Sequence, residues 1–312
     1  MKRVLKGLAL LVILAVALLF AWGYAPDGDA ASLRAKYMNA ASRFVDVGGG
    51  LAMHVRNEGK RDGPVLLHGS NSSLHTWEPW AERLGGTYRI INVDQIGHGL
   101  TGPNPAADYS SAAFVGTLDK ALTRMGVARF ALAGNSMGGW VAWNYALAHP
   151  DKLSALILVD ASGPPDAEPT ALPIGFRIAR TPGINRLARV ITPRGLVERS
   201  VRQSVSNQAV IDDAMIDRYH ELLLYPGNRD ATARRGATAR NVADPDALGR
   251  LRVPTLILWG AEDKLIPVSA GRWFARTIPG SRLIVYPGIG HLSMEEAPDR
   301  SAADVAAWLR SI

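Results

Sequence analysis

Short apolar runs separated by polar turns recur from residue 43 to the end of the chain. Arg43–Val47 and Leu51–Asn57 flank Gly48-Gly49-Gly50 and predict a β-hairpin. The later runs are short and almost continuously apolar, which is typical of strands that are buried on both faces of a parallel sheet. We assign these strands to Val65–Leu67, Arg89–Val93, Phe130–Ala133, Leu153–Val159, Thr255–Trp259 and Arg282–Tyr286.

Helical patterns separate several of these strands. One helix is expected from Ser110 or Ser111 to about Met125, a second from Met137 to Ala148 and a last one from about Ala297 to Ile312. Alternating strands and helices predict an α/β fold, in which helices cover both faces of a mostly parallel sheet. Right-handed crossovers then determine most of its topology.

This alternation stops between Gly163 and about Gly249. The segment is rich in Arg, Ala and Leu, is interrupted by prolines and contains no convincing strand pattern. We expect four to six helices here, inserted between two strands of the sheet as a lid. The predicted division is therefore a core of residues 43–162 and 250–312, a helical cap of residues 163–249, and a linker of residues 26–42 that includes a short helix.

The first 25 residues carry a different pattern. Lys2, Arg3 and Lys6 precede an uncharged, mainly apolar run from Gly7 to Ala25. At about 1.5 Å per residue this run spans roughly 28 Å as a helix, close to the hydrocarbon thickness of a bilayer. We therefore expect a membrane anchor, and the positive flank predicts that the rest of the chain is on the extracytoplasmic (periplasmic) side. A cleaved signal peptide, which would make the protein secreted, and a buried terminal helix remain alternatives.

Composition and charge exclude several classes of site. The 312 residues include no cysteine, which excludes a disulfide framework, a Cys–His catalytic pair and thiolate metal sites. The net charge is +7, but three of these charges are at the amino terminus and the other basic residues are scattered, many near acids. No basic stripe with interleaved aromatic residues is present, so we do not expect a nucleic-acid partner.

A glycine-rich turn follows the strand at Phe130–Ala133. Gly134-Asn135-Ser136-Met137-Gly138 matches G-x-S-x-G, between a buried strand and a helix. A serine on such a sharp turn needs small neighbours, and Gly134, Gly138 and Gly139 meet that need. The amides at the start of the following helix point toward the position where negative charge develops. Ser136 is therefore the candidate nucleophile.

A serine hydroxyl needs a base within hydrogen-bond reach. Of the seven histidines, His291 lies in a glycine-rich loop between the last strand and the last helix, where it can reach over the carboxyl edge of the sheet. We expect His291 to be the base. The other six histidines are expected to be structural, solvated or on the wrong loop: His54, His68, His75, His98, His149 and His220.

An acid is needed to orient the base, and it should follow the end of a strand. Asp263 lies just past Thr255–Trp259 and is the first choice. Asp160, at the end of Leu153–Val159, and Glu262, beside Asp263, stay open as alternatives. For the oxyanion hole we expect the backbone N–H of Met137, the residue after the nucleophile, and that of Ser70, with Asn71 as the alternative.

Five ordered motifs together resemble the α/β-hydrolase superfamily with a helical cap. They are Leu67-His68-Gly69, Asp94 with Gly97-His98-Gly99, Gly134 to Gly139, Gly260 with Asp263, and Gly290-His291. The resemblance covers the chain from about Arg43 to its end. It implies an eight-stranded, mostly parallel sheet with the cap over the active site, and the chain order Ser136, Asp263, His291.

The resemblance implies a serine hydrolase that needs no metal or organic cofactor. We expect it to cleave carboxylic esters of small to medium, fairly apolar substrates through an acyl-enzyme, in a pocket that Trp77, Trp140 and Trp143 could line. The alternatives are a carbon–carbon bond hydrolase of ring-fission products, a lipase, lactonase or perhydrolase, and a non-hydrolytic receptor. Ser70-Asn71-Ser72-Ser73 in place of a Gly-rich loop, and Leu292 in place of a Trp after His291, disfavour carbon–carbon hydrolysis.

Overall fold

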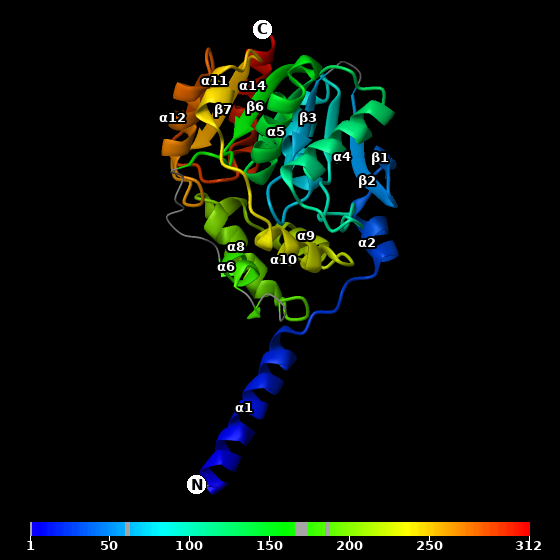
Figure 1. Cartoon of the computed structure of the whole chain (residues 1–312), viewed down its shortest axis with the longest axis vertical. Helices are drawn as coiled ribbons and strands as arrows, with labels where there is room; N and C mark the ends of the chain where they lie inside the picture. Colours follow the sequence, from blue (N-terminus) through cyan, green and yellow to red (C-terminus); the bar gives the residue numbers. More distant parts are fainter. Residues whose placement is uncertain (1, 60–62, 166–173, 182, 185–187) are drawn as a thin grey trace.

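One eight-stranded sheet organises the protein. The structure is a computed structural model that describes residues 2–59, 63–165, 174–181, 183–184 and 188–312 (Figure 1). Strand order is β1-β2-β4-β3-β5-β6-β7-β8; the pairs β1–β2 and β2–β4 are antiparallel and the others are parallel. The strands are β1 (Ser42–Gly48), β2 (Leu51–Glu58), β3 (Pro64–Leu67), β4 (Ile90–Val93), β5 (Phe130–Asn135), β6 (Leu153–Val159), β7 (Thr255–Gly260) and β8 (Arg282–Tyr286).

Helices cover both faces of this sheet. The alternation of side chains along β3 shows the two layers, because Val65 and Leu67 lie in one apolar cluster and Leu66 in the other. The first cluster includes side chains of α4 (Ser111–Arg124), α5 (Met137–Ala148) and α12 (Val268–Thr277). The second includes side chains of α3 (Glu78–Leu84), α13 (Ser293–Glu296) and α14 (Pro298–Leu309).

The predicted fold class is confirmed, and the differences are local. The strand predicted at Phe130–Ala133 extends to Asn135, the last predicted helix is α14, and a short helix that was not predicted, α13, precedes it. Pro298 occupies the first position of α14, and Ala297 before it is non-helical, with a φ of −138° and a ψ of 55°, because proline disfavours helical geometry in the residue before it. Trp77, Trp140 and Trp143 are buried in the two apolar clusters instead of lining a pocket.

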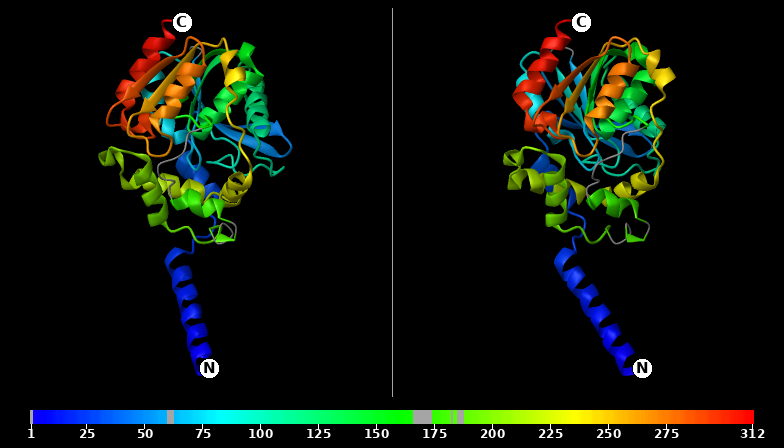
Figure 2. Two further views of the ribbon diagram at one scale, coloured as in Figure 1. Left: turned by 60° about the vertical axis from the view of Figure 1, so that its left-hand side comes forward. Right: turned by 90° about the vertical axis from the view of Figure 1, so that its left-hand side faces the viewer.

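Helices also occupy the segment between β6 and β7. The described helices are α6 (Ile174–Arg180), α8 (Arg194–Ser204), α9 (Asp213–Leu223), α10 (Asn228–Ala237), α11 (Pro245–Gly249) and a 3₁₀ turn at Gln208–Val210. Figures 1 and 2 show α6, α8, α9 and α10 beneath one end of the sheet, while α11 lies at the other end, near α12. Among the residues described in this segment, none forms a strand, as predicted, although Ile191 makes an isolated bridge with Tyr24. The boundaries of the core, cap and linker stay a prediction.

The amino terminus forms helix α1 (Lys2–Gly23), which projects away from the rest of the molecule in Figures 1 and 2. A membrane span needs about 20 consecutive apolar residues. Within the part of the chain that the structure describes, no helix combines the length and the apolar character needed to cross a membrane. The structure therefore does not support the predicted span. The predicted short helix of the linker is α2 (Ala30–Tyr37).

Candidate active site

Ser136 lies on the sharp turn between β5 and α5. Its φ angle is 56°, a left-handed conformation that is costly for a residue with a side chain and that marks functional turns. The turn is held because Ser136 N–H donates to Val159 O at 3.0 Å and Ser162 N–H donates to Ser136 O at 3.0 Å. Glycine is required at 138, since an added Cβ would lie 2.2 Å from Leu67 O.

His291 lies on the loop after β8, in contact with both the turn that carries Ser136 and the cap. Asn135 Nδ2 donates to His291 O at 3.0 Å, and His291 N–H donates to Ser204 O of α8 at 2.9 Å. His291 and Ser136 line the same cavity. The structure therefore brings the predicted nucleophile and the predicted base to one site.

Asp263 meets His291 from the loop after β7. His291 Nδ1 donates to Asp263 Oδ2 at 2.7 Å, while Asp263 Oδ1 accepts the N–H groups of Leu265 at 2.8 Å and Ile266 at 3.0 Å. We assign the proton to Nδ1 because an ionised carboxylate only accepts hydrogen bonds. Nε2 then keeps its lone pair and is able to take a proton from a hydroxyl.

The two alternative acids lie close by but do not hydrogen-bond to the imidazole. Glu262 is exposed. Asp160 is buried at the end of β6 with a φ of 46°, and its Oδ1 accepts Gly260 N–H at 2.8 Å. Burial, and secondarily the neighbouring Asp263, raise the pKa of Asp160 well above its usual value.

Asp160, Asp263 and His291 place ligand atoms within 4.8 Å of one another, a spacing that a metal ion could use. However, Asp263 already accepts three N–H groups and the raised pKa of Asp160 favours its neutral form, whereas metal ligands are deprotonated. The arrangement therefore fits proton transfer through His291 better than metal binding.

The loop after β3 lies against the nucleophile turn. A Cβ added to Gly69 would lie 3.2 Å from Ser136 Cβ, so Gly69 allows this close approach. Ser70 Oγ donates to Met137 Sδ at 3.2 Å, which brings the two predicted oxyanion-hole residues together. Hydrogen bonds of His68 fix this loop, because His68 Nε2 accepts Gln95 N–H and His68 Nδ1 donates to Gly69 O at 2.7 Å. The backbone donors of the oxyanion hole remain a prediction.

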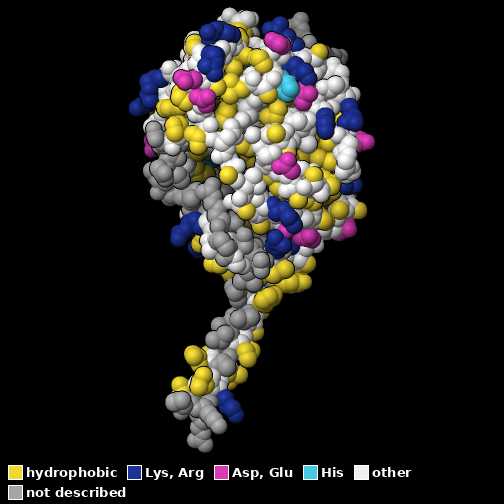
Figure 3. Space-filling model, in the orientation of Figure 1, with side chains coloured by type: hydrophobic (Ala, Val, Ile, Leu, Met, Phe, Trp, Pro, Cys, Tyr) yellow, Lys and Arg dark blue, Asp and Glu magenta, His cyan; other side chains and the backbone are white. Residues whose placement is uncertain are grey.

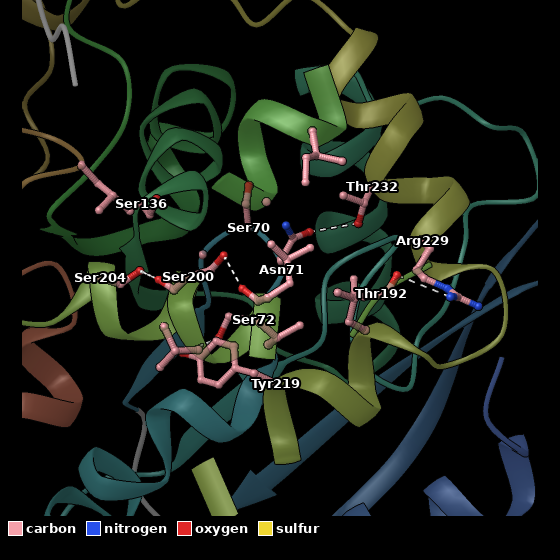
Figure 4. Close-up of a pocket in the computed structure, with 18 of the residues that line it drawn as sticks. Ser70, Asn71, Ser72, Ser136, Thr192, Ser200, Ser204, Tyr219, Arg229 and Thr232 are labelled. Atoms are coloured by element: carbon pink, nitrogen blue, oxygen red, sulfur yellow. Dashed lines mark hydrogen bonds between the residues drawn. The ribbon is translucent and has the colours of Figure 1, made fainter. Parts of the chain in front are cut away.

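A cavity of about 1090 Å³, the open space at its mouth included, extends from Ser136 into the cap (Figure 4). Ser70, Asn71 and Ser72 of the β3 loop line it on the core side, and Tyr219 and Arg229 line it on the cap side (Figure 4). Most of the remaining wall is aliphatic. These side chains come from the cap, apart from the last two: Ile178, Ala188, Ile191, Leu196, Val197, Val201, Leu223, Ala233, Leu265 and Leu292.

A second Ser–His–Asp set lies outside this cavity. His54 Nδ1 lies 2.7 Å from Asp94 Oδ2, and His54 Nε2 lies 3.0 Å from Ser42 Oγ. Ser42 Oγ also bonds to the backbone and side chain of Asn39, which closes the turn before β1. None of Ser42, His54 and Asp94 lines the cavity. This set has the contacts of a triad but lies outside the cavity that Ser136 lines, and we interpret it as structural.

Comparison with known proteins identifies the family. The family described as "alpha/beta hydrolase fold" matches residues 65–298, more than half of the chain. This protein is an α/β-hydrolase.

Its similarity to individual members of the family spans two chemistries. A 2-hydroxy-6-oxononadienedioate/2-hydroxy-6-oxononatrienedioate hydrolase of Burkholderia vietnamiensis is 26% identical over 291 residues, which are 87% of this chain and 96% of the relative. A thermophilic esterase of Thermogutta terrifontis is 26% identical with a TM-score of 0.73, and the match covers 87% of this α/β-hydrolase and 99% of the esterase.

A bacterial membrane phospholipase A shares the fold, with a TM-score of 0.72 and 24% identity over 100% of this chain and 99% of its own. The family match and the two likenesses at 26% identity support a hydrolase and leave its substrate class open.

Sequence reasoning missed the cap residues that reach the site. Thr232, Arg235 and Arg240 contact the loop at Ser70 and Asn71, but they lie more than 160 positions away in the chain. In the sequence, the two arginines look like ordinary surface charges of a helical segment. The one local signal was the Arg-rich composition of the segment between β6 and β7.

Proposed function

We propose that this α/β-hydrolase cleaves carboxylic esters through an acyl-enzyme formed on Ser136. The hydrogen bond from His291 Nδ1 to Asp263 carries the proposal, since it leaves Nε2 free to act as a base in the cavity that Ser136 lines. The similarity to the Thermogutta terrifontis esterase supports the same chemistry.

In the first half of the proposed reaction, Ser136 Oγ attacks the acyl carbon while His291 Nε2 takes its proton. Asp263 stabilises the imidazolium that forms, and the N–H groups of Met137 and Ser70 stabilise the oxyanion. The C–O bond to the alcohol then breaks, and the alcohol leaves with the proton of His291. In the second half, water attacks the acyl-enzyme with His291 as base, which releases the acid and regenerates Ser136.

The walls of the cavity indicate the class of substrate. Aliphatic side chains dominate the part formed by the cap, so they favour an apolar acyl or alcohol group. Trp77, Trp140 and Trp143 do not contribute, because they are buried in the core. Acyl length is therefore expected to depend on α8 and α9, whose Val201 and Leu223 face the cavity.

Chromogenic esters of graded acyl length test the proposal. We expect turnover that increases with acyl length up to a limit set by the cavity, and no turnover in Ser136→Ala. Ser42→Ala is the matched control, because Ser42 belongs to the second Ser–His–Asp set and its loss should leave kcat unchanged. A folded protein that hydrolyses no ester would contradict the proposal.

Carbon–carbon hydrolysis is the second candidate, because the Burkholderia vietnamiensis relative acts on such substrates by its name. It is tested by following the loss of a coloured 2-hydroxy-6-oxo-dienoate in the same preparation. A kcat/KM for this substrate above that for every ester would favour it over ester cleavage.

We also propose that α1 attaches the enzyme to a lipid surface on the extracytoplasmic side. Val4, Leu11 and Trp22 are 75%, 64% and 68% exposed, and Figure 3 shows apolar side chains along the helix. Exposed apolar surface of this extent is typical of an interaction site. Co-sedimentation with vesicles of anionic lipids should retain the whole chain and release a variant with Leu11→Lys and Leu14→Lys. Equal binding of the two proteins would contradict this.

A further inference from the structure

Three polar side chains of the cap converge on Ser70, which is predicted to be a donor of the oxyanion hole, and on Asn71, its alternative. Thr232 Oγ1 and Arg235 Nη2, both from α10, donate to Asn71 Oδ1 at 2.9 and 2.8 Å. Arg240, just after the helix, donates from Nη2 to Ser70 Oγ at 3.1 Å. Figure 4 shows Asn71 and Thr232 facing each other in the wall of the cavity.

Asn71 is the residue that these contacts constrain. Its φ angle is 58°, and asparagine tolerates this left-handed conformation better than most residues with a side chain. A peptide plane flanking such a residue is able to turn over when its side chain is released. The two planes that flank Asn71 carry the N–H groups of Asn71 and Ser72, so the orientation of the Asn71 N–H, the alternative donor of the oxyanion hole, depends on what holds the Asn71 side chain.

Arg235 is the central group of this contact. It is 5% exposed, and besides Asn71 it bonds to Gly97 O at 2.7 Å and to Thr232 Oγ1 at 2.9 Å. Across the described ranges of the chain, no ion pair joins Arg235 to a carboxylate. Burial, and secondarily the neighbouring Arg240, lower its pKa to about 9. A buried cation of this kind is stabilised by any negative charge that forms nearby.

We propose that Arg235 is a positioning residue for the oxyanion hole of the esterase, acting through Asn71. This inference rests on the proposed function. Arg235 holds the β3 loop with one nitrogen on the Asn71 side chain and another on the Gly97 carbonyl. The cap thereby takes part in transition-state stabilisation, in addition to forming the walls of the cavity.

The geometry predicts which kinetic constant depends on Arg235. The oxyanion exists only after Ser136 has attacked, so a group that acts on it changes kcat and leaves substrate binding nearly unchanged. Loss of one oxyanion-hole donor costs about 10²–10³ in kcat. Arg235 acts on the donor loop and is not itself a donor, so Arg235→Met should cost on the order of 10- to 100-fold in kcat, with KM within about threefold.

The test compares Arg235→Met with Arg234→Met, the same change one residue earlier. Arg234 points outward, pairs with Asp230 and should keep its wild-type kcat. Active sites are counted by titration with a fluorophosphonate, so that loss of folded enzyme is not mistaken for loss of kcat. Arg235→Lys, which keeps the charge without the two-nitrogen fork, should recover part of the loss.

Asn71→Gly keeps the proposal testable if Arg235→Met does not fold. Glycine tolerates the left-handed φ and removes only the acceptor of the cap contacts. Its kcat should fall by a similar factor, and Asn71→Gly with Arg235→Lys should be no worse than the poorer single variant, because both act through one contact. A wild-type kcat per titrated site in Arg235→Met and Asn71→Gly, or losses that multiply in the double variant, would overturn the proposal.

The same experiment separates this inference from the proposed function. The rate at which the fluorophosphonate reacts with Ser136 needs no ester substrate and also passes through negative charge in the oxyanion hole. If the wild type hydrolyses no ester, the proposed function fails, and the phosphonylation rate of Arg235→Met still tests the role of Arg235. A rate equal to that of Arg234→Met would reject it.

Discussion

Replacing Asp263 by asparagine tests the assignment of the acid, and the structure predicts how the new amide must orient. Asp263 Oδ1 accepts two backbone N–H groups, from Leu265 and Ile266, and Oδ2 accepts His291 Nδ1–H. An asparagine offers one oxygen and one NH₂ group. With the NH₂ at the Oδ1 position, the buried N–H of Ile266 and the part-buried N–H of Leu265 would lose their acceptor, at up to about 1–3 kcal/mol each. The amide oxygen therefore takes the Oδ1 position and the NH₂ group faces His291.

This orientation puts the proton on the wrong nitrogen of the imidazole. His291 Nδ1 must accept from the NH₂ group, so the ring proton moves to Nε2 and no lone pair remains to accept the proton of Ser136. A wrong tautomer of this kind lowers kcat by about 10⁴-fold in a serine triad. At about 1.36 kcal/mol per tenfold change, that is roughly 5.4 kcal/mol of lost transition-state stabilisation. Folding should be little affected, because asparagine has the same shape as aspartate.

The assay is kcat on a chromogenic ester, measured per titrated active site, for Asp263→Asn and for Asp160→Asn as the matched control. Asp160 lies beside the same imidazole without a hydrogen bond to it, so its variant should stay within a few-fold of the wild type. A loss of less than tenfold in Asp263→Asn would refute the reasoning. A larger loss in Asp160→Asn than in Asp263→Asn would transfer the role of the acid to Asp160.

Three further changes have outcomes that follow from the structure. Gly138→Ala should prevent the nucleophile turn from forming and lower the midpoint of urea unfolding, because its Cβ would lie 2.2 Å from Leu67 O; an unchanged midpoint would contradict this. Burial lowers the pKa of His75 from 6.5 to about 4, so the unfolded chain binds the extra proton first. About 3 kcal/mol of the free energy of unfolding, present above pH 6.5, should be lost as the pH falls through 4. His75→Gln should lose less, as measured by urea unfolding at pH 6.5 and at pH 4. Asp160 has a raised pKa, so the stability it contributes below pH 3.8 is lost as the pH rises through its folded-state value. Asp160→Asn, which cannot ionise, should therefore gain stability relative to the wild type between pH 4 and pH 8; a constant difference would show that the pKa of Asp160 is the same in the folded and the unfolded chain and is not raised by folding.

The sheet and the elements of the site could be predicted because their signals are local. A strand buried on both faces needs consecutive apolar side chains, and every predicted strand is present to within two residues at its ends. Glycines at 134 and 138 mark the nucleophile turn, since backbone from neighbouring elements leaves no space for a Cβ. Strand ends then indicate where the base and the acid lie. These features depend on a few adjacent residues, so the sequence by itself predicted them.

Tertiary structure decided everything that depends on which distant groups meet. The sequence placed both Asp160 and Asp263 after strands, and only the packing of the loops shows that Asp263 reaches His291. Nothing in the sequence indicated that Ser42 lies beside His54, a histidine that Asp94 holds in the folded chain. Arg235 meets Asn71 across 164 positions, a contact that leaves no periodic or local trace. Hydrogen bonds have ranges of about 3 Å, so chemistry that depends on them is determined by the packing of elements and not by their order along the chain.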